Sequence, residues 1–314
     1  MTILLDVILP VFLLIGVGYL AAWTKYFNDI SVDSLMGFAQ NVAVPVLLFV
    51  SVARLDLAAS FDPKLWIAFY SGAFVSFLLG WLVSERLLGR SPEEAVAIGF
   101  VCLFGNVLLL ALPLTTRAYG PDAIGGNLAI LSIHSPLLYM LGITVMEFVR
   151  TRGQSLSVGR VALRALSGVL RTPLIIGILC GLAVNVLSGF GFVLLPAIWA
   201  TADMIAAAAL PTALFALGGV LFRYRPEGDA TAIALCCVCS VIIHPTVTYG
   251  LSWLLDLSAP AMRSAVISAS APPGMNAFMF ASIYGAARRV AASTVLVSTA
   301  VSIVTIWFWL SVLP

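Results

Sequence analysis

Long runs of apolar residues recur along this chain, and each is about as long as a helix that crosses a bilayer, ~20 residues. The runs lie near residues 4–23, 33–53, 65–84, 95–117, 123–148, 167–187, 193–222, 231–255, 261–285 and 291–313. Only short polar stretches separate them, so no soluble domain fits between them. The pattern predicts an all-α integral membrane protein with ten transmembrane helices.

Composition excludes several functional classes. Hydrophobic residues make up 61% of the chain and charged residues only 10%, whereas about a quarter of a soluble domain is charged. A net charge of +2 provides no basic face for nucleic acid. The apolar runs contain no paired carboxylates and no nucleophile with an adjacent base, so we expect no enzyme and no cofactor. The cysteines in the runs lack zinc-site spacing, so we expect no metal; they are Cys102, Cys180, Cys236, Cys237 and Cys239.

The distribution of basic residues predicts the orientation. All but four of the 16 Lys and Arg residues lie in the loops that follow odd-numbered runs; the exceptions are Arg54, Lys64, Arg117 and Arg263. Because Lys and Arg concentrate in cytoplasmic loops, loop 149–166 is expected inside and both termini outside the cytoplasm. The predicted location is the plasma membrane, in a bacterium the inner membrane, with the basic loop attracting anionic lipid. The first run precedes the first cation, Lys25, and is expected to remain as a membrane helix rather than a cleaved signal.

The two halves of the chain carry matching landmarks at nearly one offset, 163 to 166 residues. The matches are Pro10 and Gly18 with Pro173 and Gly181, Pro45 and Phe49 with Pro211 and Phe215, and Tyr119-Gly120 with Tyr284-Gly285. Each half holds five runs, an odd number, so the second half enters the membrane inverted. The expected organisation is a five-helix repeat over 1–148, a cytoplasmic loop over 149–166 and a second repeat over 167–314.

Helix-breaking residues interrupt the fourth and ninth runs near their midpoints. Gly105-Asn106 are poor helix formers, and Pro272-Pro273-Gly274 remove amide donors. Half-helices 107–117 and 275–284 would then begin near the bilayer centre, and helix starts attract anions. The amides of Asn106 and Asn276 can orient a carboxylate. The alternative is that these residues only let helices kink and pack.

Other polar residues inside the runs are less specific. Asp203 and His134 are candidates for carrying a coupling proton. The alternative for Asp203 is a position near the outer interface of the membrane. The alternative for His134, two residues before Pro136, is a hydrogen bond to a backbone carbonyl left free at a kink. Gln40 and Asn41 are polar enough to line a substrate cavity.

Several of these motifs resemble the auxin efflux carrier family, which includes plant auxin transporters and bacterial carriers, some assigned to malonate. The resemblance covers essentially the whole chain; it rests on Asn106-x6-Pro113, on the stretch from Ala271 to Phe278, and on Asn41-x3-Pro45 with Pro211-x3-Phe215. It implies a 5+5 inverted repeat in which the broken fourth and ninth helices cross. Helices 1, 2, 6 and 7 would form a scaffold, usually a homodimer, and helices 3–5 and 8–10 a mobile transport domain. Pro45, Pro113 and Pro211 would be hinge or crossover positions.

The resemblance also assigns single residues. Asn106 matches the family's asparagine at the first crossover and Pro272 its proline at the second. Gly105 stands where the plant proteins have a proline, Leu48 where they have a serine, and Asn276 where they have an apolar residue. These departures favour an organic anion smaller than auxin.

The expected function is therefore secondary or facilitative transport of a small carboxylate anion by elevator-type alternating access. Coupling to H⁺, Na⁺ or neither is left open. The alternative is an anion channel or a ligand-sensing membrane protein of the same fold, because broken helices also build pores.

Overall fold

The computed structural model describes residues 4–55, 62–150, 172–224, 227 and 229–314. Helices account for 85% of the structure, and the described residues contain no β-strand. Seven helices among them are long and apolar enough to cross a membrane: Leu4–Trp23, Asp29–Ala53, Pro63–Arg86, Gly125–Arg150, Pro196–Arg223, Ala230–Leu254 and Arg288–Val312. The predicted class, a multi-pass all-α membrane protein, is confirmed.

The three other predicted spans contain shorter helices. The sixth contains α10 (Pro173–Ser188); its first residues, 167–171, and loop 149–166 beyond Arg150 lie outside the described residues. The fourth is divided into α6 (Pro92–Leu103) and a second helix over Val107–Tyr119. The ninth is divided into α14 (Ala259–Ser270) and α15 (Met275–Tyr284). The count of ten spans and the inverted repeat stay predictions.

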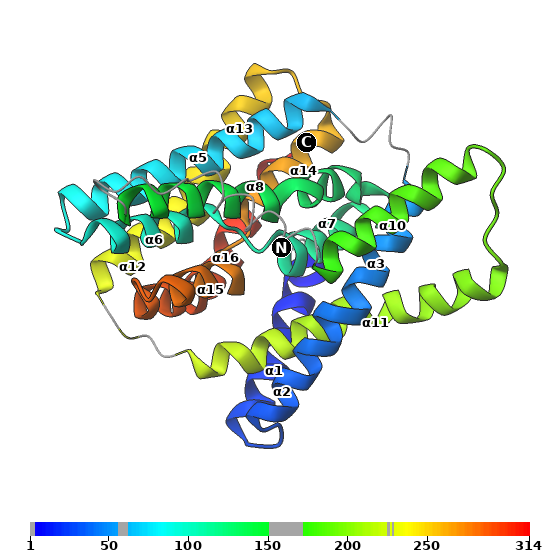
Figure 1. Cartoon of the computed structure of the whole chain (residues 1–314), viewed down its shortest axis with the longest axis horizontal. Coiled ribbons are helices and arrows are strands. Elements are labelled where there is room, and N and C mark those ends of the chain that lie inside the picture. The colour runs from blue at the N-terminus through cyan, green and yellow to red at the C-terminus, as the bar shows by residue number, and fades with distance from the viewer. Residues whose placement is uncertain (1–3, 56–61, 151–171, 225–226, 228) are drawn as a thin grey trace. The chain divides into compact units, whose positions relative to one another are not determined.

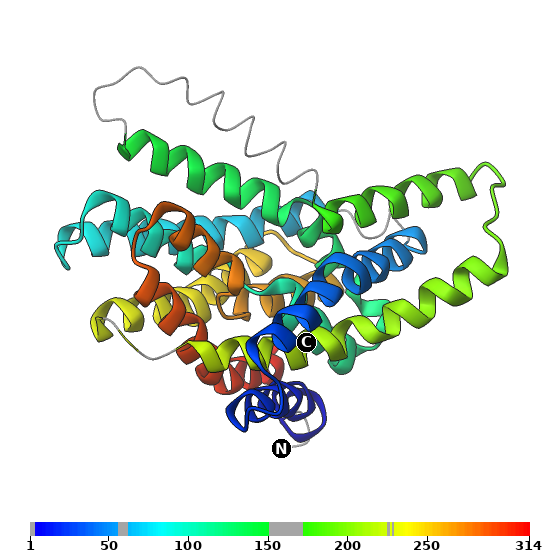
Figure 2. The same cartoon turned by 60° about the horizontal axis from the view of Figure 1, so that its bottom comes forward.

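Four helices widen into a π-helical turn just before a proline. Proline lacks an amide hydrogen and its ring collides with the carbonyl four residues earlier, and the wider turn, with i→i+5 bonds, avoids both problems. The turns are η1 (Leu4–Ile8), η2 (Ala39–Ala43), η3 (Val107–Ala111) and η5 (Cys239–Ile243), and the prolines two residues beyond them are Pro10, Pro45, Pro113 and Pro245. In contrast, α8 (Gly125–Arg150) and α11 (Pro196–Arg223) continue through Pro136 and Pro211, and Figure 2 shows α8 as one uninterrupted helix.

The chain divides into two compact units. The smaller unit comprises residues 9–60 and 167–223, and the larger unit residues 1–8, 61–166 and 224–314. The smaller unit contains α1 (Leu9–Trp23), α2 (Asp29–Phe38), η2, α3 (Val44–Ala53), α10 and α11. Within it α1 packs against α11, and α10 packs against α3 (Figure 1).

Two glycines allow the close helix packing of the smaller unit. A Cβ atom on Gly18 would lie 1.9 Å from the carbonyl oxygen of Phe215, and one on Gly181 would lie 2.6 Å from that of Phe49. These four residues are landmark pairs of the predicted repeat. In one contact a glycine of the first half faces a carbonyl of the second half, and in the other a glycine of the second half faces a carbonyl of the first half. Neither glycine can take a side chain without moving the neighbouring backbone.

Ion pairs connect the helix ends of the smaller unit. Arg54, after α3, pairs with Asp203 of α11 through two bonds of 2.9 Å, and its guanidinium lies 4.5 Å from the centre of the Trp199 ring. Arg223, the last residue of α11, pairs at 3.1 Å with Asp29 and at 2.7 Å with Asp33 of α2. The stretch from α2 to α3 thus ends next to Arg54, which pairs with an aspartate of α11. Helix α11 in turn ends at Arg223, which pairs with two aspartates of α2.

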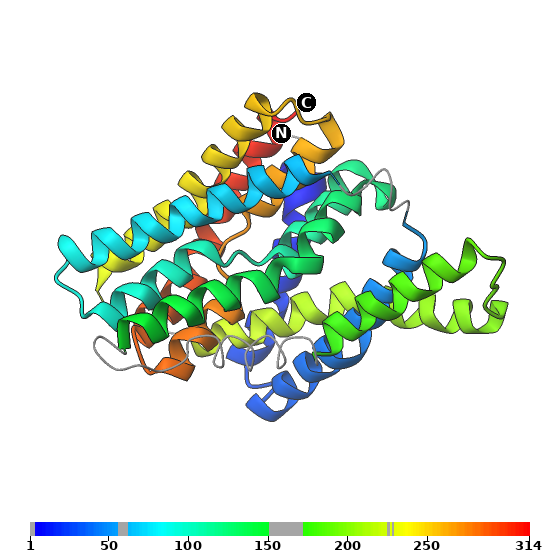
Figure 3. The same cartoon turned by 45° about the horizontal axis from the view of Figure 1, so that its top comes forward.

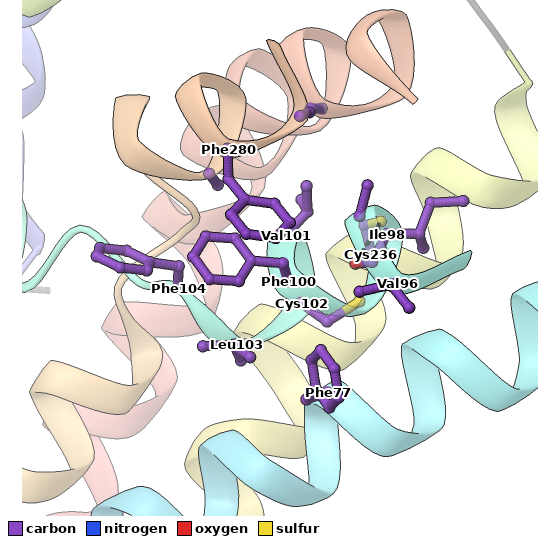
Figure 4. Close-up of a cluster of buried hydrophobic side chains, with 14 of the residues drawn as sticks. Phe77, Val96, Ile98, Phe100, Val101, Cys102, Leu103, Phe104, Cys236 and Phe280 are labelled. Carbon is purple, nitrogen blue, oxygen red and sulfur yellow. Dashed lines mark hydrogen bonds between the residues drawn. The ribbon is translucent and has the colours of Figure 1, made fainter. Parts of the chain in front are cut away.

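The two divided helices belong to the larger unit. It contains η1, α5 (Pro63–Arg86), α6, η3, α7 (Leu112–Tyr119), η4 (Pro121–Ile124), α8, α12 (Ala230–Val238), η5, α13 (His244–Leu254), α14, α15 and α16 (Arg288–Val312). Helices α5 and α13 run side by side (Figure 3). In its buried core the rings of Phe100 and Phe280 stack at 3.8 Å between centroids (Figure 4). Because Phe100 precedes the first break and Phe280 follows the second, this stack holds the two divided helices together.

Candidate functional site at two broken helices

Each divided helix is interrupted by a short extended stretch. Helix α6 ends at Leu103 and η3 begins at Val107, while α14 ends at Ser270 and α15 begins at Met275. The two breaks lie where the sequence placed them, at Gly105-Asn106 and at Pro272-Pro273-Gly274. The second half-helices, Val107–Tyr119 and Met275–Tyr284, agree closely with the predicted 107–117 and 275–284.

The two breaks bind each other through their backbones. The amide of Asn106 donates to the carbonyl of Pro272 at 2.8 Å, and that of Gly274 donates to the carbonyl of Phe104 at 3.4 Å. Gly105 and Pro273 form an isolated antiparallel bridge between these bonds. Unpaired peptide groups in hydrocarbon cost several kcal/mol each. The pairing removes part of that cost and fixes the two half-helix starts beside each other.

Both half-helix starts retain unpaired amide groups. Asn106 is the N-cap of the first, where its Oδ1 accepts from the amide of Leu109 at 3.3 Å. Gly274 is the N-cap of the second and offers no side chain. Four backbone N–H groups then have no acceptor among the described residues: those of Val107, Leu108, Met275 and Asn276. Two helix starts with free donors form an environment that favours an anion.

The side chains at the breaks are neutral. Asn106 and Asn276 are partly exposed, whereas Gly105, Pro272, Pro273 and Gly274 are buried. Asn106 packs closely on Gly274, because a Cβ atom there would lie 3.1 Å from the Cβ and Cγ of Asn106. The Nδ2 group of Asn106 has no partner in the described part of the chain and remains available as a donor.

Tyr139 belongs to the same site and was missed by the sequence analysis. Its hydroxyl donates to the backbone oxygen of Asn276 at 3.3 Å and lies 3.5 Å from its Oδ1. Its ring packs edge to face against Phe104 at 5.5 Å. A tyrosine inside an apolar span, three residues after Pro136, is a sequence signal of the right kind, because a buried phenol hydroxyl usually has a hydrogen-bond partner.

The two buried histidines of the larger unit differ in their partners. His244 places Nε2 3.2 Å from the carbonyl oxygen of Phe69. His134 is 2% exposed, and neither of its ring nitrogens has a hydrogen-bond partner among the described residues. Its ring lies 4.8 Å from that of Phe104, edge to face. His134 therefore lies next to the first break, separated from it by one aromatic side chain.

The remaining predicted residues belong to the smaller unit. Asn41 is exposed, with Nδ2 bonded to the carbonyl of Gly37 at 2.9 Å, and Gln40 is partly exposed within η2. Pro45 follows η2, and Pro211 lies inside the continuous helix α11. Asp203 is about half exposed and paired with Arg54. Of the hinge candidates, only Pro113 lies in the larger unit, in the first turn of α7.

Charged groups of the larger unit gather at its helix ends. Arg90 pairs with Asp229, the N-cap of α12, and lies 3.9 Å from Glu94. The pKa of Asp229 lies below its ordinary value, because the backbone amide of Thr231 donates to its carboxylate and Arg90 pairs with it. Within the described residues no cluster of His, Cys, Asp and Glu has metal-site geometry.

Comparison with known proteins identifies relatives over almost the full length. A family model described as "Membrane transport protein" matches residues 3–310. The chain is 27% identical over 301 residues to the "Putative malonate transporter" of Rhizobium meliloti (strain 1021), covering 95% of this chain and 92% of that protein. It is 22% identical over 315 residues to the "Uncharacterized transporter YfdV" of Escherichia coli (strain K12), covering 99% and 98%. It is 20% identical over 320 residues to the "Uncharacterized transporter MJ1031" of Methanocaldococcus jannaschii, covering 97% of each.

Proposed function

We propose that this chain, which belongs to the membrane transport protein family and so to the auxin efflux carriers that its motifs resemble, moves a small organic anion by alternating access. The observation that carries the proposal is the pair of half-helix starts at the breaks, with four backbone donors that have no acceptor among the described residues. Among the described residues, no Lys or Arg lies in either break. The anion's charge would rest on helix dipoles and amide hydrogens.

The proposed substrate is a small carboxylate. One relative is named as a malonate transporter, although at 27% identity, and neutral amides suit a planar carboxylate that accepts several hydrogen bonds. Asn106 would donate through Nδ2, and Asn276 would orient the anion at the second half-helix. Gly105, Pro272, Pro273 and Gly274 would form the backbone of the site. Gln40 and Asn41 stay candidate substrate-binding residues of the smaller unit.

For the transport cycle we propose an elevator mechanism in which the larger unit carries the anion and the smaller unit is the scaffold of a homodimer. The division of the chain supports this proposal, because residues 9–60 and 167–223 contain the predicted spans 2, 6 and 7 and all of span 1 beyond residue 8. The exchanged contacts of Gly18 and Gly181 support the inverted repeat of five plus five spans. Pro45, Pro113 and Pro211 would be the hinge positions. The Lys and Arg distribution supports a plasma-membrane protein, in bacteria of the inner membrane, with both termini outside the cytoplasm.

Uptake of labelled malonate into liposomes containing the purified protein tests the function. Asn106→Ala should reduce uptake at least about tenfold, because it removes a donor to the anion and the cap of its half-helix. Asn28→Ala is a matched control: Asn28 is also an N-cap asparagine, whose Oδ1 accepts from the amide of Ser31 at 2.9 Å, but it caps α2 in the smaller unit. Equal uptake by wild type and Asn106→Ala would contradict the assigned site.

The same liposomes separate a carrier from a channel. A carrier shows saturating uptake and is accelerated by malonate on the opposite side of the membrane, because the loaded site returns faster than the empty one. Single-channel currents would contradict the carrier and favour a pore.

A further inference from the structure

We propose that one proton accompanies each anion through this protein and that the imidazole of His134 holds it. The inference rests on the proposed function and adds the coupling ion to it. It begins from an anomaly: both ring nitrogens of a 2% exposed histidine have no hydrogen-bond partner among the described residues. Buried polar atoms are nearly always paired, and one without a partner calls for an explanation.

The position of His134 relates it to the anion site. Its ring contacts the ring of Phe104 at 4.8 Å, and the carbonyl of Phe104 accepts the amide hydrogen of Gly274, the N-cap of α15. The backbone of Gly105 also lies directly against the imidazole, although this contact does not have the distance and angle of a hydrogen bond. His134 therefore lies beside the backbone that connects both half-helix starts, within reach of the electric field of an anion bound there.

The surroundings of His134 provide no other counter-charge. From α5 it faces Phe69, at 5.7 Å between ring centres, and Tyr70, at 6.3 Å. The Tyr70 hydroxyl is occupied by the carbonyl of Ile130 at 2.9 Å. From α13 the nearest titratable group is His244, which would repel a second positive charge. Among the described residues, no Asp, Glu, Lys or Arg acts electrostatically on His134.

Anion binding and protonation then favour each other. A buried imidazole with no anionic partner is stable only in its neutral form, because burial disfavours the charge. An anion at the half-helix starts supplies the missing opposite charge and favours imidazolium. By linkage, a protonated His134 raises the affinity for the anion by the same factor. The proton would bind a ring nitrogen from the solution on one side and leave with the anion on the other, which regenerates the neutral imidazole.

The two other candidates for a coupling proton fit less well. The Asp203 carboxylate is already bound by Arg54 through two hydrogen bonds on a half-exposed surface. His244 already uses Nε2 on the carbonyl of Phe69. Of these three candidates within the described residues, His134 alone is buried with no hydrogen bond to either ring nitrogen.

Calorimetry of malonate binding tests the proposal with the whole purified protein. Titrations in two buffers of different ionisation enthalpy give the number of protons taken up with each malonate, and for wild type we expect a value approaching one. The apparent affinity should rise as the pH falls, by at most about tenfold per pH unit for a single linked proton. In His134→Gln the proton uptake linked to the protein should disappear, while malonate still binds.

Two controls make the result specific. Any proton uptake that comes from malonate itself persists in His134→Gln and is subtracted, and His244→Gln, which changes the other buried histidine, should retain the linked proton.

Equal proton uptake by wild type and His134→Gln would overturn the proposal and leave the anion carrier intact. If His134→Gln does not fold, the wild-type measurement decides: proton uptake no larger than malonate alone accounts for overturns the inference. Absence of binding of any small carboxylate to wild type would overturn the proposed function and this inference together.

Discussion

Glycine and proline have opposite roles at the helix contacts of the smaller unit and at the two breaks of the larger unit. In the smaller unit Gly18 and Gly181 bring continuous helices into backbone contact, and α11 passes through Pro211 without interruption. In the larger unit Gly105 and the Pro272-Pro273-Gly274 stretch end helices and leave backbone donors unpaired. The same residue types thus permit close helix packing at one place and interrupt helices at the other. The difference depends on what faces them: a neighbouring helix for the first pair, and a second break for the others.

The largest expected effect comes from filling the helix contact of the smaller unit. Gly18→Ala places a Cβ atom 1.9 Å from the carbonyl oxygen of Phe215, so the helices must separate. The stability loss should exceed the ~1–3 kcal/mol typical of overpacking and reduce the yield of monodisperse protein on gel filtration. Gly16→Ala, on the same helix with nothing within 4 Å of the new atom, should behave as wild type. Two equally stable variants would refute the close packing.

A smaller and different effect is expected at the breaks. Gly274→Ala places a Cβ atom 3.1 Å from the Asn106 side chain, which must move away from the N-cap position. Malonate uptake should fall at least about tenfold, a loss of ~1.4 kcal/mol in transition-state stabilisation, while thermal stability changes little. Gly250→Ala, in α13 of the same unit with no atom within 4 Å of the new Cβ, should leave uptake unchanged. Normal uptake by Gly274→Ala would show that the contact with Asn106 is not needed.

Removal of a single hydroxyl tests the residue that the sequence did not reveal. Tyr139→Phe deletes the hydrogen bond from the hydroxyl to Asn276, worth about 0.5–1.5 kcal/mol net, so the dissociation constant for malonate should rise about 2- to 12-fold. Tyr249→Phe is the matched control, because Tyr249 packs on Trp309 of α16 at 5.5 Å and away from the breaks. An unchanged dissociation constant for Tyr139→Phe would remove Tyr139 from the site.

The smallest effect concerns the partly exposed ion pairs. Because the pKa of Asp229 is lowered by the amide of Thr231 and by Arg90, its contribution to stability is present above the unfolded-state pKa, about 3.9, and is lost as the pH falls through the lower folded-state pKa. Asp229→Asn should therefore melt slightly below wild type near neutral pH, and the difference should shrink as the pH falls below about 4. A difference that grows on acidification would contradict the pairing. Asp203→Asn tests the corresponding pair with Arg54 in the smaller unit.

Local sequence chemistry predicted the position of both breaks, because Gly105-Asn106 and two adjacent prolines disfavour a helix whatever surrounds them. It did not predict the bond from Asn106 to Pro272 or the contact of Tyr139 with Asn276, since both partners are far away along the chain. The start of the second span shows the same limit at short range. The apolar run suggested residue 33, but the helix begins at Asp29, because Asn28 caps it. The π-turns before Pro10, Pro45, Pro113 and Pro245 depend on backbone adjustment that the apolar pattern does not record.

The pairing of the two breaks also has a consequence for synthesis of the chain. Asn106 emerges from the ribosome long before Pro272, whose carbonyl accepts its amide hydrogen. At about 5–20 residues per second, the first break waits roughly 8–30 s for its partner. During that time its exposed peptide groups need other hydrogen-bond partners, such as water in the insertion machinery or lipid headgroups. The first half of the chain therefore enters the membrane with the backbone of its break unpaired, and this pairing is completed only after the second half has been synthesised.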